Sequence, residues 1–339
     1  MRLPILGLAL AACALAAAPS APAQDAGERR AEATRQAEAL LSAVVQVRMR
    51  ASPDARSSET LGATREGSGV VIDGNGHIVT IGYLVIEPEA IEITTFEGKR
   101  FPARLVGYDH ATGFGLLRSL APLPNVTPMP LGDAAALAVG EPVLVMPHGG
   151  PGAVSFAEVV SKRPFAGSWE YLLDSALFTS PPTLAWAGAA LVDRGGRLVG
   201  VGSLLVRDAV EPGTPRPGNM FVPIDLLKPI LADLQDAGRA KGPPRPWMGL
   251  ATEEVEGGLV VTRVSPDGPA DRAGLRRGDV VVAVGAVPVR THREFYRRVW
   301  ALGPAGTEIP ITVRQGAATR EVRLRSIDRF DYFRAGKGT

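Results

Sequence analysis

Short apolar runs separated by glycine- and proline-rich turns fill the chain from about residue 44 to residue 222. Runs such as VVQVRMR, HIVTIGYLV and AEVVSKR are β-rich, and a GNG turn at 74–76 separates two of them. Strands that recur at such short spacing predict an all-β barrel or sandwich rather than alternating strands and helices. The segment IDLLKPILADLQ at 224–235 then predicts a helix, and we expect Pro229 to lie in its early turns or to kink it.

A second unit follows the segment DAGRAKGPPRP at 236–246, which has no periodicity and is typical of an interdomain linker. Within this unit, THREFYRRVWAL predicts a helix that begins with a capping box formed by Thr291 and Glu294. The apolar face of the helix is predicted to carry Phe295, Val299 and Leu302. Two alternating strands end the unit, with inward positions at Ile309, Ile311, Val313, Val322 and Leu324.

The N-terminus has the features of an export signal. An apolar run from Leu3 to Ala18 precedes small residues that predict cleavage after Ala23, which gives a signal peptide at 1–23. The run is shorter than the ~20 residues that span a bilayer. The LAAC sequence ending at Cys13 also resembles a bacterial lipobox, so a lipoprotein is the alternative. The polar segment 24–37 is expected to be a solvated lead-in that could contact a neighbouring subunit.

Composition narrows the classes of function. The 339 residues provide for two or three domains, and 45% hydrophobic with 21% charged residues is typical of a soluble, folded protein. A net charge of +2 gives no electrostatic case for a nucleic-acid partner. The sequence contains no HExxH or CxxC motif and no nucleotide-binding glycine loop, so neither a metal nor a cofactor is expected. Removal of Cys13 would leave no thiol nucleophile.

The second unit resembles a PDZ domain, because SPDGPADRAGLRRGDVVVAVG at 265–285 follows the family pattern SPAxxAGLxxGDxIxxxxG. The WMGL sequence at 247–250 resembles the carboxylate-binding loop of HtrA PDZ domains. The resemblance implies that backbone N–H groups hold a peptide's terminal carboxylate while the peptide adds as a strand. The implied peptide-binding residues are Trp247, Met248, Gly249, Leu250, Phe295 and Val299. Alternatively, this PDZ domain only packs against its own barrel or another subunit.

The first unit resembles the HtrA family of trypsin-like serine proteases along 44–235. Three ordered segments carry the resemblance: GSGVVIDGNGHIVT, LGDAAALAVGEPVLVM and GNMFVPIDLLKPILADL. It implies a mainly β protein, with a trypsin-like double β-barrel followed by a C-terminal PDZ domain. The expected divisions are a barrel domain at 38–235, the linker, a PDZ domain at 247–328 and a C-terminal tail at 329–339.

The same resemblance places the three positions of the catalytic triad. The family's TNxHVV box is TIGYLV here, which puts Tyr83 at the histidine. Its xDxxTDLAVL box is YDHATGFGLL, which puts Gly113 at the aspartate, and its NPGNSGGPLV box is TLAWAGAALV, which puts Ala187 at the serine. The positions follow the chain order of trypsin-like triads. All three are vacated, so no catalytic residue is expected.

These substitutions remove the chemistry of acyl transfer. Ala187 has no nucleophilic atom, Gly113 has no carboxylate, and the Tyr83 phenol, with an ordinary pKa of ~10, stays protonated at neutral pH. Four more changes surround the nucleophile position, and a Cβ where the loop needs a positive φ would force it to rearrange. The changed residues are Ala185, Trp186, Ala189 and Ala190. We also expect Trp186 to fill the space of a substrate carbonyl.

The sequence also contains residues that other catalytic arrangements would need. The four histidines (His77, His110, His148 and His292) are expected in surface loops or at helix ends. HGGPG at 148–152 resembles an oxyanion motif of α/β-hydrolases, but GxSxG does not occur, and the barrel alignment makes the segment a turn. The enzyme alternative is a serine endopeptidase that uses displaced residues, which would be Ser175, Ser180 or Ser203 with His110 or His148.

Together these features predict an exported pseudoprotease of the periplasm. Its partners would be protein or peptide C-termini or extended segments of envelope proteins, with a role as adaptor, regulator or chaperone-like scaffold. Because HtrA barrels usually trimerise, a homotrimer or a mixed trimer with an active HtrA protease is expected.

Overall fold

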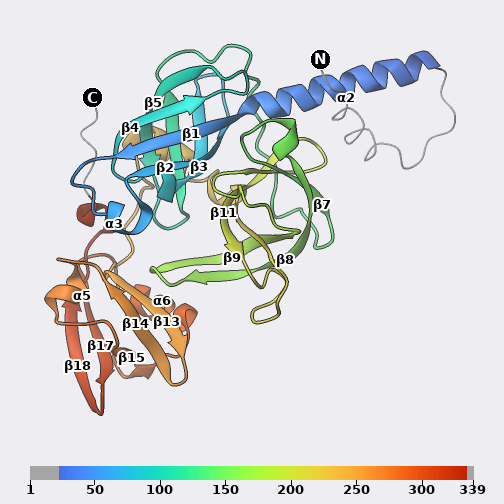
Figure 1. Cartoon of the computed structure of the whole chain (residues 1–339). Helices are drawn as coiled ribbons and strands as arrows, with labels where there is room; N and C mark the ends of the chain where they lie inside the picture. Colours follow the sequence, from blue (N-terminus) through green and yellow to red (C-terminus); the bar gives the residue numbers. More distant parts are fainter. Residues whose placement is uncertain (1–22, 334–339) are drawn as a thin grey trace.

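Two closed six-stranded β-barrels form the first part of the computed structural model, which describes residues 23–333 (Figure 1). The first barrel consists of β1 (Val44–Ala51), β2 (Thr64–Val71), β3 (His77–Ile81), β4 (Pro88–Thr94), β5 (Arg100–Tyr108) and β6 (Phe114–Ser119). The second consists of β7 (Pro142–Met146), β8 (Ser155–Gly167), β9 (Tyr171–Ser180), β10 (Ala190–Val192), β11 (Leu198–Val206) and β12 (Gly218–Pro223). All neighbouring strands are antiparallel, so the mainly β double barrel expected from the sequence is confirmed.

The two barrels share a hydrophobic core. Side chains as far apart in sequence as Phe114 and Phe178 belong to one buried cluster, and both are fully buried. The GNG turn joins β2 to β3 as predicted, and the side chain of Asp73 closes it by accepting the N–H groups of Asn75 and His77 at 2.9 and 3.1 Å. The joint core fixes the orientation of the two barrels, and therefore the shape of the cleft between them.

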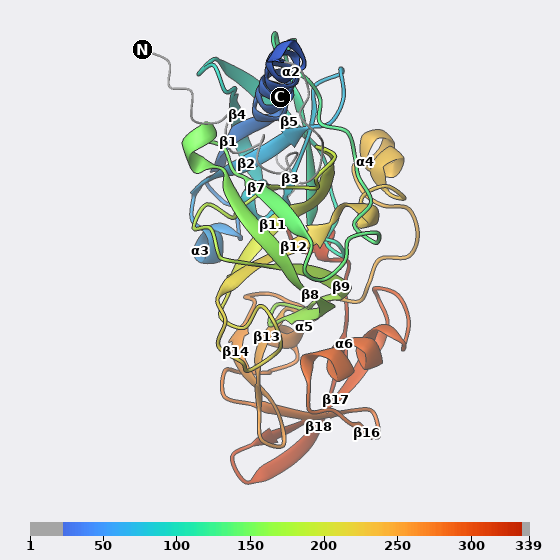
Figure 2. The ribbon, with the colours of Figure 1, turned by 90° about the vertical axis from the view of Figure 1, so that its right-hand side faces the viewer.

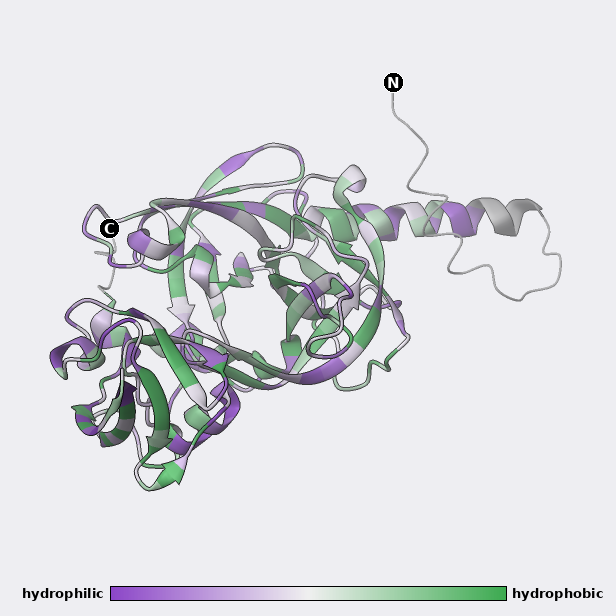
Figure 3. Cartoon of the chain, turned by 60° about the horizontal axis from the view of Figure 1, so that its bottom comes forward, coloured by the Kyte–Doolittle hydropathy of each residue, from purple (hydrophilic) through white to green (hydrophobic). Residues whose placement is uncertain are grey.

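Helix α2 (Ala23–Ala43) runs through the boundary predicted at residue 37 and ends where β1 begins. Its last turns bury Leu40 and Leu41 against the barrel, whereas the turns further out carry hydrophilic residues (Figure 3). The predicted lead-in therefore forms the outer part of this helix, with residues 28–36 exposed or half-buried and Ala37 buried, and the two leucines belong to the part predicted as barrel domain. The predicted signal peptide and Cys13 lie outside the described residues, apart from Ala23. Within residues 23–333, no helix has the length and apolar character needed to cross a bilayer.

Pro229 divides the helix predicted at 224–235. A 3₁₀ turn, η3 (Ile224–Leu226), precedes the proline, and α4 (Leu231–Ala237) follows it. Gly238 ends α4 in a left-handed conformation with φ of 74°, where its N–H binds the carbonyl of Leu234.

The C-terminal unit is a five-stranded antiparallel sheet with a short side strand. Its order is β13-β14-β15-β17-β18, so β13 is an edge strand, and β16 pairs with β15. The strands are β13 (Leu250–Val255), β14 (Gly258–Val264), β15 (Val280–Val284), β16 (Val287–Pro288), β17 (Glu308–Gln315) and β18 (Ala318–Arg325), with helices α5 (Pro269–Arg272) and α6 (His292–Trp300). The capping box of α6 and the inward positions of the last two strands are confirmed. Leu302 was predicted on the apolar face of the helix, but it lies beyond the helix end and is 39% exposed.

Two elements join the barrels to the C-terminal unit. The hairpin of β8 and β9 extends from the second barrel to the PDZ-like sheet, as Figures 1 and 2 show from two sides, and Leu172 of this hairpin belongs to the core of that sheet. Helix α7 (Arg329–Tyr332) lies in the segment predicted as a tail and returns to the first barrel, where Phe330 meets the His110 ring at 4.6 Å between centroids. The predicted linker also packs, because Arg245 lies over the ring of Trp300 at 4.2 Å.

Candidate functional site

A cavity of about 630 Å³ lies between the barrels and the PDZ-like unit. Tyr83 and Gly113, two of the predicted triad positions, line it together with Trp186. Ala187, the third position, follows Trp186, and its carbonyl accepts the N–H of Ser68 at 2.8 Å. The fold thus brings the three sequence-predicted positions to one region.

The side chain of Tyr83 is hydrogen bonded to the backbone of the second barrel. It lies in η1 (Gly82–Leu84), and its hydroxyl donates to the carbonyl of Ser203 at 2.9 Å. Ser203 lies at a bulge of β11, between Gly202 and Leu204, where the regular ladder is interrupted. Burial raises the pKa of Tyr83 well above its usual value, so the phenol stays protonated and cannot act as a general base.

We expect Tyr83→Phe to lower the free energy of unfolding by about 1–2 kcal/mol, because a buried carbonyl loses its donor. Urea unfolding measures this loss. Leu61→Ala, at an exposed residue of the same cavity, is the control and should change stability less. A Tyr83→Phe protein as stable as the wild type would show that the hydroxyl has no structural role.

Gly113 has backbone geometry that disfavours a carboxylate-bearing residue. Its φ is +83°, and an added Cβ would lie 3.2 Å from the hydroxyl oxygen of Tyr171. Its carbonyl accepts the N–H of Gly82 at 2.7 Å, which connects it to the segment that carries Tyr83.

In the loop at the nucleophile position, the positive φ angle falls on a glycine and not on the alanines. Gly188 adopts a positive φ of +73°, whereas neither Ala185 nor Ala189 does. The Gly188 N–H donates to the carbonyl of Gly202 at 2.9 Å, and the Ala189 N–H donates to the carbonyl of Trp186 at 3.0 Å. These two N–H groups therefore bond within the second barrel, whereas the carbonyl of Ala187 bonds to β2 of the first barrel.

His110 was expected in a surface loop, and that prediction was wrong. Its ring is enclosed by Tyr108, Phe330 and Phe333, with ring centroids 4.4–5.7 Å away. Burial lowers its pKa well below the ordinary 6.5. No hydrogen-bond partner faces its Nδ1 atom within the described chain. Two of these three rings, Phe330 and Phe333, come from a segment about 220 residues later, which local pattern does not reveal.

Two other histidines have structural partners. The Nδ1 atom of His77 lies 2.6 Å from the Asp73 carboxylate in the GNG turn, and His77 is largely buried there. His292 caps the PDZ-like groove at the start of α6, with Nε2 bonded to the carbonyl of Thr252 at 2.9 Å. The surface-loop prediction was wrong for His77, which is buried at the start of β3, whereas His292 begins α6, as expected for a residue at a helix end.

His148 forms a pair with a serine that the sequence did not single out. Its Nδ1 atom lies 3.1 Å from the Oγ atom of Ser68, and the same Oγ accepts the backbone N–H of His148 at 2.9 Å. Its Nε2 atom lies 3.7 Å from the Glu66 carboxylate. Ser68 is only 1% exposed, so a substrate carbonyl has no access to its hydroxyl. HGGPG itself forms the turn that leads into η2 (Pro151–Ala153), as expected.

The WMGL loop holds a carboxylate. The N–H groups of Met248, Gly249 and Leu250 donate to the side-chain oxygens of Glu170 at 2.9, 2.7 and 2.9 Å. Glu170 lies between β8 and β9 and is buried. Burial raises its pKa to about 7, against the lowering effect of these N–H groups and of Arg329. Trp247 packs on Tyr332 of α7, with ring centroids 4.5 Å apart.

Two of the predicted peptide-binding residues lie in the core of the C-terminal unit and not in its groove. Phe295 and Val299 are fully buried in the core of the C-terminal sheet, so they do not line an open groove. The helix positions that face β13 and the hairpin are His292 and Tyr296, which stand four residues apart on one face. The hydrophobic pattern identified a buried face, but it could not distinguish the core side from the groove side.

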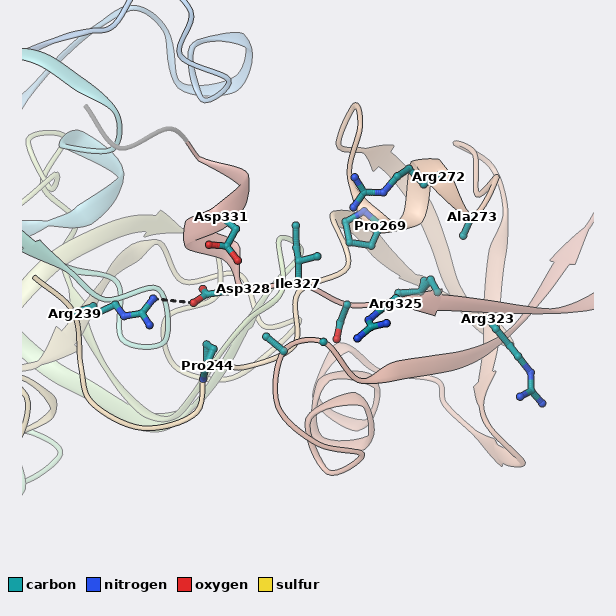
Figure 4. Close-up of a pocket in the computed structure, with 14 residues that line it drawn as sticks. Arg239, Pro244, Pro269, Arg272, Ala273, Arg323, Arg325, Ile327, Asp328 and Asp331 are labelled. Atoms are coloured by element: carbon teal, nitrogen blue, oxygen red, sulfur yellow. Dashed lines mark hydrogen bonds and ion pairs between the residues drawn. The ribbon is translucent and has the colours of Figure 1, made fainter. Parts of the chain in front are cut away.

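A second hollow of about 720 Å³ separates the linker from the C-terminal sheet (Figure 4). Arg272, Arg323 and Arg325 line one side of it, and the ion pair of Arg239 with Asp328, 3.0 Å long, lies on the other. None of its lining residues is a histidine. Across the described residues, no three His, Cys, Asp or Glu side chains group closely enough to hold a metal ion.

Comparison with known families agrees with this architecture. Residues 67–201 match the trypsin-like peptidase domain, and residues 260–315 match the PDZ domain. The fold and the two matches define a HtrA/DegS-like arrangement, in which a trypsin-like peptidase domain precedes a PDZ domain.

Three similar proteins are named as proteases. The chain is 29% identical to the serine endoprotease DegS of Escherichia coli over 266 residues, which cover 73% of this chain and 72% of DegS. It is 26% identical over 274 residues to a probable periplasmic serine endoprotease DegP-like protein of Brucella suis, covering 76% of this chain but only 52% of that protein. The chain therefore spans about half the length of that relative. The solved HtrA-type protease AlgW with a decapeptide aligns over 89% of this chain and 98% of its own, with a TM-score of 0.52 and 20% identity.

Proposed function

We propose that this protein is a non-catalytic HtrA-like protein that binds C-termini or extended segments of envelope proteins. The proposal rests mainly on the residues that stand at the three triad positions, because none of them can take its catalytic role. Tyr83 donates its hydroxyl to a backbone carbonyl, Gly113 holds a positive φ, and Ala187 has no side-chain oxygen. A nucleophile, a base and a group that orients the base are all required for acyl transfer.

Peptide binding is supported by the WMGL loop. Three convergent backbone N–H groups there bind a carboxylate, which is the group at the end of every peptide chain. The similar protein AlgW is described with a bound decapeptide, which is the behaviour we propose here. The periplasm is the proposed location, because the DegP-like relative is named periplasmic. A trimer, alone or mixed with an active HtrA protease, remains part of the proposal.

The second candidate is a serine endopeptidase that uses displaced residues, and one observation favours it. Ser68 and His148 form a serine–imidazole pair within hydrogen-bond distance. The serines predicted from the sequence form no such pair: in the described part of the chain, none of Ser175, Ser180 and Ser203 is hydrogen bonded to a histidine. Burial of Ser68 and the backbone N–H that its Oγ already accepts favour a structural tie between the barrels.

A casein digestion assay separates the two candidates. We expect the purified protein to release no serine-dependent fragments, and Ser68→Ala to leave this result unchanged. The exposed Ser175→Ala is the matched control. Proteolysis that a serine-directed phosphonate and Ser68→Ala both abolish would refute the non-catalytic proposal.

Display of random C-terminal peptides to the full chain tests the binding function, and equal capture of free and amidated C-termini would contradict carboxylate recognition.

A further inference from the structure

Glu170 holds the position in the PDZ-like unit that a peptide's terminal carboxylate would need. Its two oxygens take up the N–H groups of the WMGL loop, as described above, so no donor of Met248, Gly249 or Leu250 is left for another anion. The residue adopts a φ of +58°, which is uncommon for a residue with a Cβ and aims the side chain from the hairpin turn into the loop.

The backbone beside Glu170 also imitates a bound strand. The N–H of Thr252, on edge strand β13, donates to the carbonyl of Ser168 at 3.0 Å. On the helix side, the Tyr296 hydroxyl accepts the Glu170 N–H at 3.1 Å and donates to the Gly167 carbonyl at 2.7 Å. A peptide that adds to an exposed sheet edge makes contacts of this kind.

Side chains fasten the same hairpin to the sheet. Leu172 is buried in the core of the PDZ-like unit, and Ala166 packs against that core. Outside the core, Arg297 of α6 lies 2.6 Å from the exposed Asp174 carboxylate. The hairpin therefore enters the groove as a ligand would, with a carboxyl group in the loop and an apolar side chain beneath the strand.

We propose that Glu170 is an internal ligand of the PDZ site, which must leave the WMGL loop before a partner's C-terminal carboxylate binds. The inference rests on the peptide-binding function proposed above and adds its regulation. Ser168, Trp169 and Tyr171 of the same hairpin line the cavity that holds Tyr83 and Gly113. The hairpin that carries Glu170 is therefore also part of the wall of this cavity.

The test uses Glu170→Ala in the full chain, with Glu158→Ala as matched control, since Glu158 is an exposed residue of the same hairpin, remote from the loop. Two readouts are needed: residue-resolved hydrogen exchange of the amides of 248–250 without peptide, and fluorescence polarisation with a labelled random decapeptide library. We expect Glu170→Ala to speed exchange at these amides and to bind free-carboxylate peptides roughly tenfold tighter or more. Glu170→Gln, which keeps the shape and one acceptor, should lie between.

The outcomes separate the inference from the function on which it rests. Equal peptide affinity and unchanged amide exchange in Glu170→Ala would overturn the internal ligand but leave peptide binding standing. Faster amide exchange in Glu170→Ala, with no peptide bound by any variant, would support occupancy of the loop by Glu170 and refute the proposed function. Tighter binding by Glu158→Ala as well as Glu170→Ala would attribute the effect to general loosening of the hairpin and overturn the inference.

Discussion

Gly188→Ala should unfold at a temperature roughly 6–12 °C below that of the wild type, the largest effect we expect from a single methyl group in this chain. The added Cβ would lie 2.0 Å from the carbonyl oxygen of Ser68 and 2.8 Å from the Oγ1 atom of Thr80. Because the first contact is with backbone, either the loop or strand β2 must shift. The positive φ of +73° adds strain of its own. Differential scanning calorimetry gives the transition temperature.

Gly74→Ala is the matched control for this experiment. Gly74 lies in the GNG turn, and an added Cβ there would meet no atom within 4 Å. We expect its transition temperature to stay close to that of the wild type. A Gly188→Ala transition as high as that of Gly74→Ala would mean that the loop after Ala187 is not held in the described conformation.

The hairpin contact should weaken as pH rises from about 5 to 8. The pKa of Glu170 is raised from 4.5 to about 7 when its carboxyl is buried in the loop, so the closed state binds a proton that the open state releases. The stabilisation is fully present below 4.5 and is lost as pH rises through 7. Exchange of the amides of 248–250, corrected for intrinsic exchange chemistry, should therefore be roughly tenfold or more faster at pH 8 than at pH 5.

Other charged groups near Glu170 do not explain such a change. Burial raises the pKa of Tyr296, which therefore stays protonated across this range, and burial lowers the pKa of His110 well below 6.5, away from the value of Glu170. Asp109, Arg245 and Arg329 also line the small cavity of about 200 Å³ beside Glu170. Glu170→Gln has no titrating group at this position and should flatten the profile. A pH dependence that persists in Glu170→Gln would assign it to another residue.

Elements set by local chemistry were predictable from the sequence. The capping box of α6 needs only a hydroxyl and a carboxylate three residues apart, and both hydrogen bonds form. The alternation of apolar and polar residues likewise predicted that Ile309, Ile311 and Val313 point inward on β17, because successive side chains of a strand point to opposite faces of the sheet. The break at Pro229 follows from the absence of an N–H group in proline.

Contacts between distant segments were not predictable in this way. Glu170 lies in a hairpin turn, where a glutamate carries no local signal, and its partners are about 80 residues later. The pairing of Ser68 with His148 spans the same separation. The anion-binding character of the WMGL loop could be inferred from a resemblance, but the group that occupies it depends on how two domains pack. Positive φ at a non-glycine residue is a signal that only the structure supplies.

The return of α7 to the first barrel bears on how this protein should be handled. Phe333 stacks on His110, with ring centroids 5.7 Å apart, and Tyr332 donates to the carbonyl of Pro266 at 2.9 Å. These side chains lie where the barrel and the PDZ domain meet. An affinity tag or fluorescent fusion placed directly after them is therefore expected to disturb the packing between the two domains. Measurements of peptide uptake are therefore best made on protein purified through a removable tag at the other end.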